Sequence, residues 1–142
     1  MLVRNKFFLM LIFTMPFVLS ACQGNAANVG EEVSVEGDSY RVVSVQDLQT
    51  MLEDKDFTMI NVHTPWQGDI PQTDSRLAYD QILQSQDQLP AGTDAKILVY
   101  CQTSGMAKKA VQSLVGLGYT NVWMLEGGTT TWEEAGLTLE KE

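Results

Sequence analysis

Short apolar runs alternate with stretches of helical periodicity through most of the chain. The runs at 40–43, 57–62, 96–100 and 121–125 are rich in β-branched and aromatic residues and are bounded by turn-forming residues, so they predict strands. Residues 97–100 are all apolar. Such a run is typical of a strand that is buried on both faces of a parallel sheet.

Helices are predicted between these strands, where apolar residues recur every three or four positions. Ser44 and Asp47 have the spacing of a capping box, which predicts a helix start. The segment 105–117 places its alanines, valine and leucines on one face and its lysines on another, so it predicts the longest helix. Two shorter helices are expected at about 81–88 and 130–135.

Strands that alternate with helices of this length indicate βαβ units. We therefore predict an α/β fold with a mainly parallel sheet and helices on both faces. Ligands of such sheets bind beyond the carboxyl ends of the strands, where a strand leads into a helix. In this chain that rule points to the turn between the strand that ends at Tyr100 and the helix that begins at Gly105.

The first 22 residues have the pattern of a targeting segment. Arg4 and Lys6 precede an apolar run from 7 to 19, which is short for a membrane span and ends in Leu-Ser-Ala-Cys at 19–22. This ending resembles the processing box of bacterial lipoproteins, in which the cysteine is acylated and becomes the first residue of the mature chain. A transmembrane anchor or a secretory signal with an incidental cysteine is the alternative.

The lipoprotein interpretation divides the chain into three parts. Residues 1–21 form the signal peptide, 22–39 a flexible tether rich in Gly, Asn, Ala and Glu, and 40–142 the folded domain. The resemblance implies lipidation of Cys22, contact with the membrane through that lipid, and a place in the cell envelope outside the cytoplasmic membrane, on its periplasmic or extracellular face.

Charge and composition exclude several functions. The chain has 9 basic and 18 acidic residues and a formal net charge of −9, so it is not expected to bind nucleic acid or an anionic lipid surface by charge. Two cysteines and one histidine provide neither a disulfide framework nor a His-rich metal site. The chemistry must therefore come from few residues, and we expect no metal.

Cys101 is the candidate for that chemistry. It follows the most apolar strand and precedes a short loop of small and hydroxyl residues that opens a helix. Backbone N–H groups and the positive end of the helix dipole would stabilise a thiolate and bind a substrate oxyanion at this place. A buried structural cysteine is the alternative, since most isolated cysteines are of that kind.

Several spaced motifs resemble those of single-domain rhodaneses, which are sulfurtransferase-type domains. The resemblance extends from about residue 40 to 137 and implies a rhodanese-like α/β fold with a mainly parallel five-stranded sheet. The matching segments are Tyr100–Gly105 with Ala110 and Leu114 behind it, Gly68–Pro71, Leu117–Tyr119, Asn121–Val122, Leu125–Gly128 and Trp132.

The resemblance also implies a mechanism. Cys101 would take a sulfane sulfur as a persulfide and pass it to a thiol or to cyanide, with no cofactor. The partners would be a small sulfur donor and a thiol acceptor, and we expect a monomer. Gly127 and Gly128 would serve close backbone approach. The loop that holds the persulfide, through backbone N–H groups and the two hydroxyls, would comprise Gln102, Thr103, Ser104, Gly105, Met106 and Ala107.

The active-site loop departs from the family pattern in its charge. Active members often have arginine directly after the cysteine and a basic residue at the sixth loop position, where this chain has Gln102 and Met106. Lys108 and Lys109 follow on the helix, where we expect a solvated face. The loss of loop cations predicts weak use of the dianion thiosulfate and better use of less charged persulfides or polysulfides.

Three further positions differ from the family. The usual strand-end aspartate and arginine are Asn61 and His63 here, and Asp69 stands where histidine is common. A general base is one interpretation of His63. The resemblance favours a structural role for that position, and a histidine in a loop is typically solvated or hydrogen-bonded.

Two other functions compete with sulfur transfer. The first is a binding module for a small anion, a peptide or a protein partner, in which the thiol is incidental; Gln102 and Met106 favour it, and Cys101 disfavours it. The second is a cysteine-type phosphatase or arsenate reductase. That chemistry normally needs an arginine at the end of the loop, where this chain has Met106 and Ala107.

Overall fold

The structure, a computed structural model, describes residues 29–35 and 37–141. Within these ranges no helix has the length and apolar character needed to cross a bilayer. The elements are β1 (Glu31–Val35), β2 (Asp38–Val43), α1 (Val45–Glu53), β3 (Thr58–Asn61), β4 (Ser75–Arg76), a 3₁₀ turn (Gln86–Gln88), β5 (Ile97–Tyr100), α2 (Gly105–Gly116), β6 (Val122–Leu125) and α3 (Gly128–Glu134).

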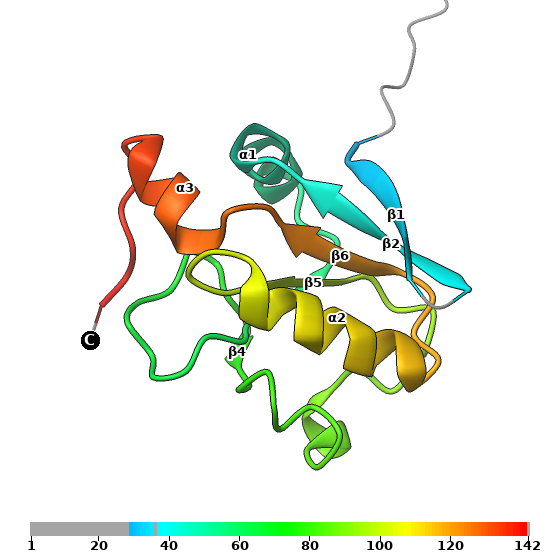
Figure 1. The fold of residues 1–142 in the computed structure, drawn as a ribbon. Coiled ribbons are helices and arrows are strands. Elements are labelled where there is room, and N and C mark those ends of the chain that lie inside the picture. Colours follow the sequence, from blue (N-terminus) through cyan, green and yellow to red (C-terminus); the bar gives the residue numbers. More distant parts are fainter. Residues whose placement is uncertain (1–28, 36, 142) are drawn as a thin grey trace, which may run out of the picture.

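The strands form one sheet in the order β1-β2-β6-β5-β3-β4 (Figure 1). The five strands from β2 to β4 are parallel to their neighbours, and β1 pairs with β2 in the antiparallel direction. The mainly parallel sheet is confirmed. It has six strands instead of the expected five, and the additional strand is the antiparallel β1. β5 lies between β6 and β3, and all four of its residues are buried.

The start of the described chain corrects the expected tether. Residues 31–35 lie within the segment predicted to be flexible, yet they form β1 and pair with β2 from Glu31 opposite Val42 to Val35 opposite Asp38. Polar and valine residues alternate over 31–35, and Gly37 has a φ of +97°. This alternation and the glycine are the features of a hairpin. The predicted signal peptide and Cys22 lie outside the described residues.

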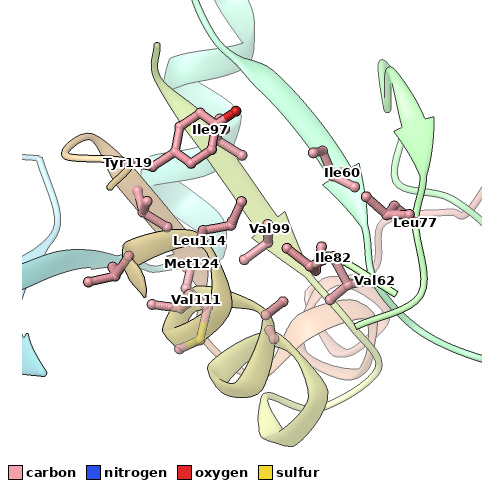
Figure 2. Close-up of a cluster of buried hydrophobic side chains, with 14 of the residues drawn as sticks. Ile60, Val62, Leu77, Ile82, Ile97, Val99, Val111, Leu114, Tyr119 and Met124 are labelled. Carbon is pink, nitrogen blue, oxygen red and sulfur yellow. The ribbon is translucent and has the colours of Figure 1, made fainter. Parts of the chain in front are cut away.

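Helices cover both faces of the sheet, as predicted. The α2 side carries one cluster of buried side chains, part of which Figure 2 shows between the helix and β5. The other side packs α1 and α3 against the sheet through Leu48 and Trp132. The α2 cluster includes Ile60, Val62, Ile82, Ile97, Val99, Ala107, Val111, Leu114, Val122 and Met124.

The helix boundaries show which sequence signals were reliable. Both reciprocal hydrogen bonds of the Ser44–Asp47 capping box are present, and α2 spans nearly the whole predicted segment. The helix predicted at 81–88 is wrong, because only the 3₁₀ turn Gln86–Gln88 forms there. Ile82 is buried while its neighbour Leu83 is 54% exposed, and the rest of the segment is polar. It has no apolar stripe that could hold a helix against the sheet.

Candidate active site

Cys101 directly follows β5 and lies below the first turn of α2. Its residue exposure is 2%, and its Sγ accepts a hydrogen bond from the Ala107 backbone N–H at 3.4 Å. α2 is twelve residues long, so its N-terminal N–H groups carry a substantial helix dipole toward the sulfur. The thiol therefore lies between the end of β5 and the start of α2, as predicted.

A cleft of about 350 Å³ opens over the thiol. Four residues of the predicted loop line it, and so do side chains from two other parts of the chain. The lining residues are His63, Tyr79, Cys101, Gln102, Thr103, Gly105, Met106 and Lys109.

Ser104 and Ala107 belong to the predicted loop but are not among the residues that line the cleft. Ser104 was expected to offer its hydroxyl to a persulfide, but Ser104 Oγ donates to the Thr103 carbonyl and accepts from the Gly127 N–H at 2.9 Å. The hydroxyl thus bonds within the loop and to the Gly127 N–H in this structure, and its expected part in holding a persulfide stays a prediction. Ala107 has a buried side chain and contributes its N–H to the sulfur.

The first turn of α3 holds the Cys101 loop from the other side. The Thr129 N–H donates to the Cys101 carbonyl at 2.9 Å, and the Thr130 N–H donates to the Gln102 carbonyl at 2.9 Å. Gly128 has a φ of +58°, and a Cβ there would lie 2.0 Å from the Cys101 carbonyl oxygen. Only glycine allows so close an approach. The role expected for Gly128 is thus confirmed.

A buried polar network fixes the segment that carries His63. Asn61 Nδ2 donates to the Gly68 carbonyl at 3.0 Å and to Asp69 Oδ1 at 2.8 Å, while Asn61 Oδ1 accepts from the His63 backbone N–H at 3.0 Å. Arg76 Nε forms an ion pair with Asp69 Oδ2 at 2.7 Å. Asn61 and Asp69, two of the positions that differ from the family pattern, are therefore hydrogen-bonded to each other.

The ionisation of Asp69 follows from this network. Burial by itself favours the protonated carboxyl, but the hydrogen bonds from Asn61 and Arg76 and the charge of Arg76 outweigh it, so the pKa of Asp69 lies below its ordinary value. The carboxylate is thus charged and paired at neutral pH. Backbone hydrogen bonds between Asp69 and Glu140, at 2.8 and 2.9 Å, tie the C-terminal segment to the same turn.

The imidazole of His63 forms part of the cleft wall. Both ring nitrogens are buried and have no hydrogen-bond partner within residues 29–35 and 37–141, where the expected solvated or hydrogen-bonded ring is therefore not found. Burial lowers the pKa of His63 below its ordinary value. The ring is therefore neutral at pH 7 and adds no positive charge to the cleft.

Residues 44–135 match the rhodanese-like domain family. The chain belongs to that family. Over 105 residues it is 28% identical to the thiosulfate sulfurtransferase GlpE of Vibrio cholerae, a match that covers 72% of this chain and 97% of the relative. The family resemblance predicted from the motifs is thus confirmed, and so is the rhodanese-like α/β fold.

Solved structures show the same fold. A rhodanese-related protein from Thermoplasma volcanium superposes with a TM-score of 0.61 at 24% identity and covers 72% of this chain and 100% of its own. A protein of unknown function from Rhodopseudomonas palustris, described as a possible tyrosine phosphatase, superposes with a TM-score of 0.58 at 22% identity and covers 68% and 82%. At these identities the likeness concerns the fold alone.

The rhodanese-like site contains residues that sequence reasoning missed. Lys108 and Lys109 are both exposed, as the predicted solvated face requires, but the prediction did not foresee that Lys109 also lines the cleft. The available signal was its spacing of three and four residues from Met106 and Gly105, which places the three on one side of α2. Tyr79 lies in the cleft wall without any sequence signal. Among the described residues, no group of three or more His, Cys, Asp or Glu side chains is arranged to hold a metal.

We predict that Gly128→Ala destabilises the domain far more than Gly136→Ala. Gly136 also has a positive φ, +79°, but a Cβ there meets nothing within 4 Å, so its change costs only the conformational strain of about 1 kcal/mol. At Gly128 the new Cβ overlaps the Cys101 carbonyl, which adds roughly 2 kcal/mol or more. Denaturant unfolding measures both. Equal losses in the two variants would contradict the close contact at Gly128.

Asp69→Asn is expected to reduce stability in a pH-dependent way. The folded-state pKa of Asp69 is depressed, so its contribution is present above the unfolded pKa of about 3.9 and is lost as pH falls through the folded value. Hydrogen bonds to charged groups contribute about 1.5–3 kcal/mol, reduced here because the Arg76 side chain is 42% exposed. Urea unfolding at pH 7 should therefore show a loss of about 1–2 kcal/mol that shrinks toward pH 3.

The exposed Asp80 provides the control for that series. Asp80→Asn should change stability by less than about 0.5 kcal/mol at either pH. A loss in Asp69→Asn that stays constant between pH 7 and pH 3 would mean that the carboxylate charge is not what stabilises the network.

Proposed function

We propose that the protein is a sulfurtransferase or persulfide carrier in which Cys101 is the nucleophile. The observation that carries this proposal is the thiol at the base of a cleft, with Sγ accepting the Ala107 N–H, inside a rhodanese-like domain. The Vibrio cholerae relative, which is named as a thiosulfate sulfurtransferase, supports the same activity.

The reaction consists of two displacements at sulfur. The Cys101 thiolate attacks the outer sulfur of thiosulfate, an S–S bond forms on the enzyme, the S–S bond of the donor breaks, and sulfite leaves with the electron pair. A thiolate or cyanide then attacks the outer sulfur of the persulfide, and the Cys101 thiolate is released. Each step conserves charge, and neither step needs an external oxidant, a reductant or a cofactor.

The site residues contribute mainly by position. The Ala107 N–H and the α2 dipole stabilise negative charge on the Cys101 sulfur, both before attack and in the persulfide. The bonds from Thr129 and Thr130 to the loop carbonyls prevent those carbonyl oxygens from turning toward the sulfur. Gln102 and Thr103 line the cleft beside it and offer neutral donors.

The composition of the cleft disfavours phosphoryl transfer. Of the described residues that line it, none is an arginine, and the loop ends in Met106 and Ala107. The equatorial oxygens of a transferring phosphoryl group therefore find no bidentate cation. A binding module for a small anion, a peptide or a protein partner stays as the second candidate, because the loop has Gln102 and Met106 where active family members often have cations.

Cys101→Ser is expected to fold normally and to lose sulfur transfer almost entirely, since a hydroxyl does not form a persulfide. Intact mass after treatment with thiosulfate or polysulfide should show one added sulfur atom on the unmodified domain, and cyanide should remove it. The serine variant should show no addition. A protein without an adduct under any donor would instead be the binding module.

We also propose that Cys22 carries a lipid that anchors the protein on the outer side of the cytoplasmic membrane, which the Leu-Ser-Ala-Cys sequence at 19–22 supports. Cys22→Ala should abolish labelling by a fatty-acid analogue and should release the chain from the membrane fraction. The sulfur transfer of the folded domain should be unchanged. Continued acylation of the alanine variant would refute the anchor.

A further inference from the structure

The cleft over Cys101 differs in charge from the rest of the molecule. The chain has twice as many acidic as basic residues, with a net charge of −9. No carboxylate occurs among the described residues that line the cleft, whereas Lys109 does. Since the His63 ring is kept neutral by burial, Lys109 supplies the positive charge of this wall. An anion that enters meets a lysine and no opposing acid.

The two neighbouring lysines of α2 point to different places. Lys109 shares the cleft side of the helix with Gly105 and Met106. Lys108 lines a separate hollow on the other side of the loop, together with Ser104 and the two acidic residues Glu31 and Glu126. Lys108 therefore shares its hollow with two carboxylates and does not line the cleft over the thiol. Lys108 thus serves as a control for Lys109, because the two residues have the same side chain but lie at different places.

The position of Lys109 is restrained by an aromatic ring. Its Nζ lies 5.3 Å from the centroid of Tyr79, within the range of a cation–π contact. The Tyr79 backbone N–H donates to the Val62 carbonyl at 3.1 Å, directly before His63. The Tyr79 backbone is thus fixed beside His63, and its ring lies in the cleft wall next to the exposed ammonium group of Lys109.

We propose that Lys109 is a specificity-determining residue that receives the anionic group of the sulfur donor, in place of the loop cations that Gln102 and Met106 have replaced. This assignment rests on the proposed sulfur transfer. When the Cys101 thiolate attacks the outer sulfur of thiosulfate, the sulfonate oxygens carry the charge that leaves as sulfite. Lys109 attracts those oxygens during binding and departure, whereas a donor without such a group gains nothing from it.

The size of the effect follows from exposure. Lys109 is exposed, so its interaction with an anion at about 4 Å is close to the aqueous value of about 1 kcal/mol, which is about fivefold in affinity. Salt screens such an interaction. The expected contribution is therefore smaller than that of a bidentate arginine in the loop and mainly affects KM.

The test compares two donors in the full chain and in three variants. Thiosulfate has a sulfonate group beside the transferred sulfur, whereas 2-hydroxyethyl persulfide has no such group and carries its single negative charge on the transferred sulfur itself. Lys109→Met should lower kcat/KM for thiosulfate about three- to tenfold through KM and leave the persulfide within about twofold. Lys108→Met should change neither donor, and Lys109→Arg should retain the thiosulfate activity. About 0.5 M salt should shrink the difference between the full chain and Lys109→Met.

The possible failures are distinct. If the unmodified chain transfers sulfur but Lys109→Met keeps the ratio of the two donors, the assignment of Lys109 is wrong and the proposed function stands. Equal losses in Lys108→Met and Lys109→Met would also refute it, because long-range charge would then explain both. If the unmodified chain takes sulfur from neither donor, the proposed function and the assignment are refuted together.

Discussion

The contact between Gly128 and the Cys101 carbonyl is the constraint on which the site depends. The carbonyl at the end of β5 has to turn toward α3, because the Thr129 N–H satisfies it there. Once it does, the following backbone N–H groups are free to turn toward the sulfur, and the Ala107 N–H reaches Sγ. A side chain at position 128 would separate the two segments. The position of the thiol therefore depends on the absence of a side chain at Gly128, which is distant in sequence.

The opposite wall is fixed by the polar network of Asn61, Asp69 and Arg76. Asn61 and His63 stand where the family pattern has an aspartate and an arginine. The structure supplies the carboxylate from Asp69 and the guanidinium from Arg76. This network holds the His63 backbone N–H through Asn61 Oδ1, and among the described residues it makes no hydrogen bond to the imidazole. The neutral ring is therefore placed in the cleft wall by its backbone.

Sequence alone predicted the parts of the fold that local signals determine. The apolar run of β5, the capping box of α1 and the periodicity of α2 are each encoded within a few residues, and they place Cys101 correctly. β1 was missed because composition was weighed above the alternation of polar residues and valines at 31–35. The segment 81–88 was overpredicted because its polar residues suit a helix, whereas Ile82 is its one buried residue and a single buried side chain does not hold a helix against the sheet.

The contacts within the site that the sequence did not indicate have a different origin. The tasks of Ser104 and Lys109 depend on contacts with Gly127 and Tyr79, which are more than twenty residues away in sequence and have no local signature. Local periodicity can say which side of a helix a lysine occupies, but it does not say what covers that side.

The position of the cation has a consequence for selectivity. A guanidinium in the loop would move with the loop and bind an anion bidentately, whereas Lys109 stands on a rigid helix and offers one point charge. Lys109 affects anion binding largely because the rest of the molecule is acidic and repels anions that approach elsewhere. A single point charge selects little between anions of different shape. On an acidic molecule, however, it makes the cleft more favourable for an anion than the rest of the surface. In the proposed function this charge would guide a donor to the thiol, while the backbone that Gly128 allows would determine the reactivity of the sulfur.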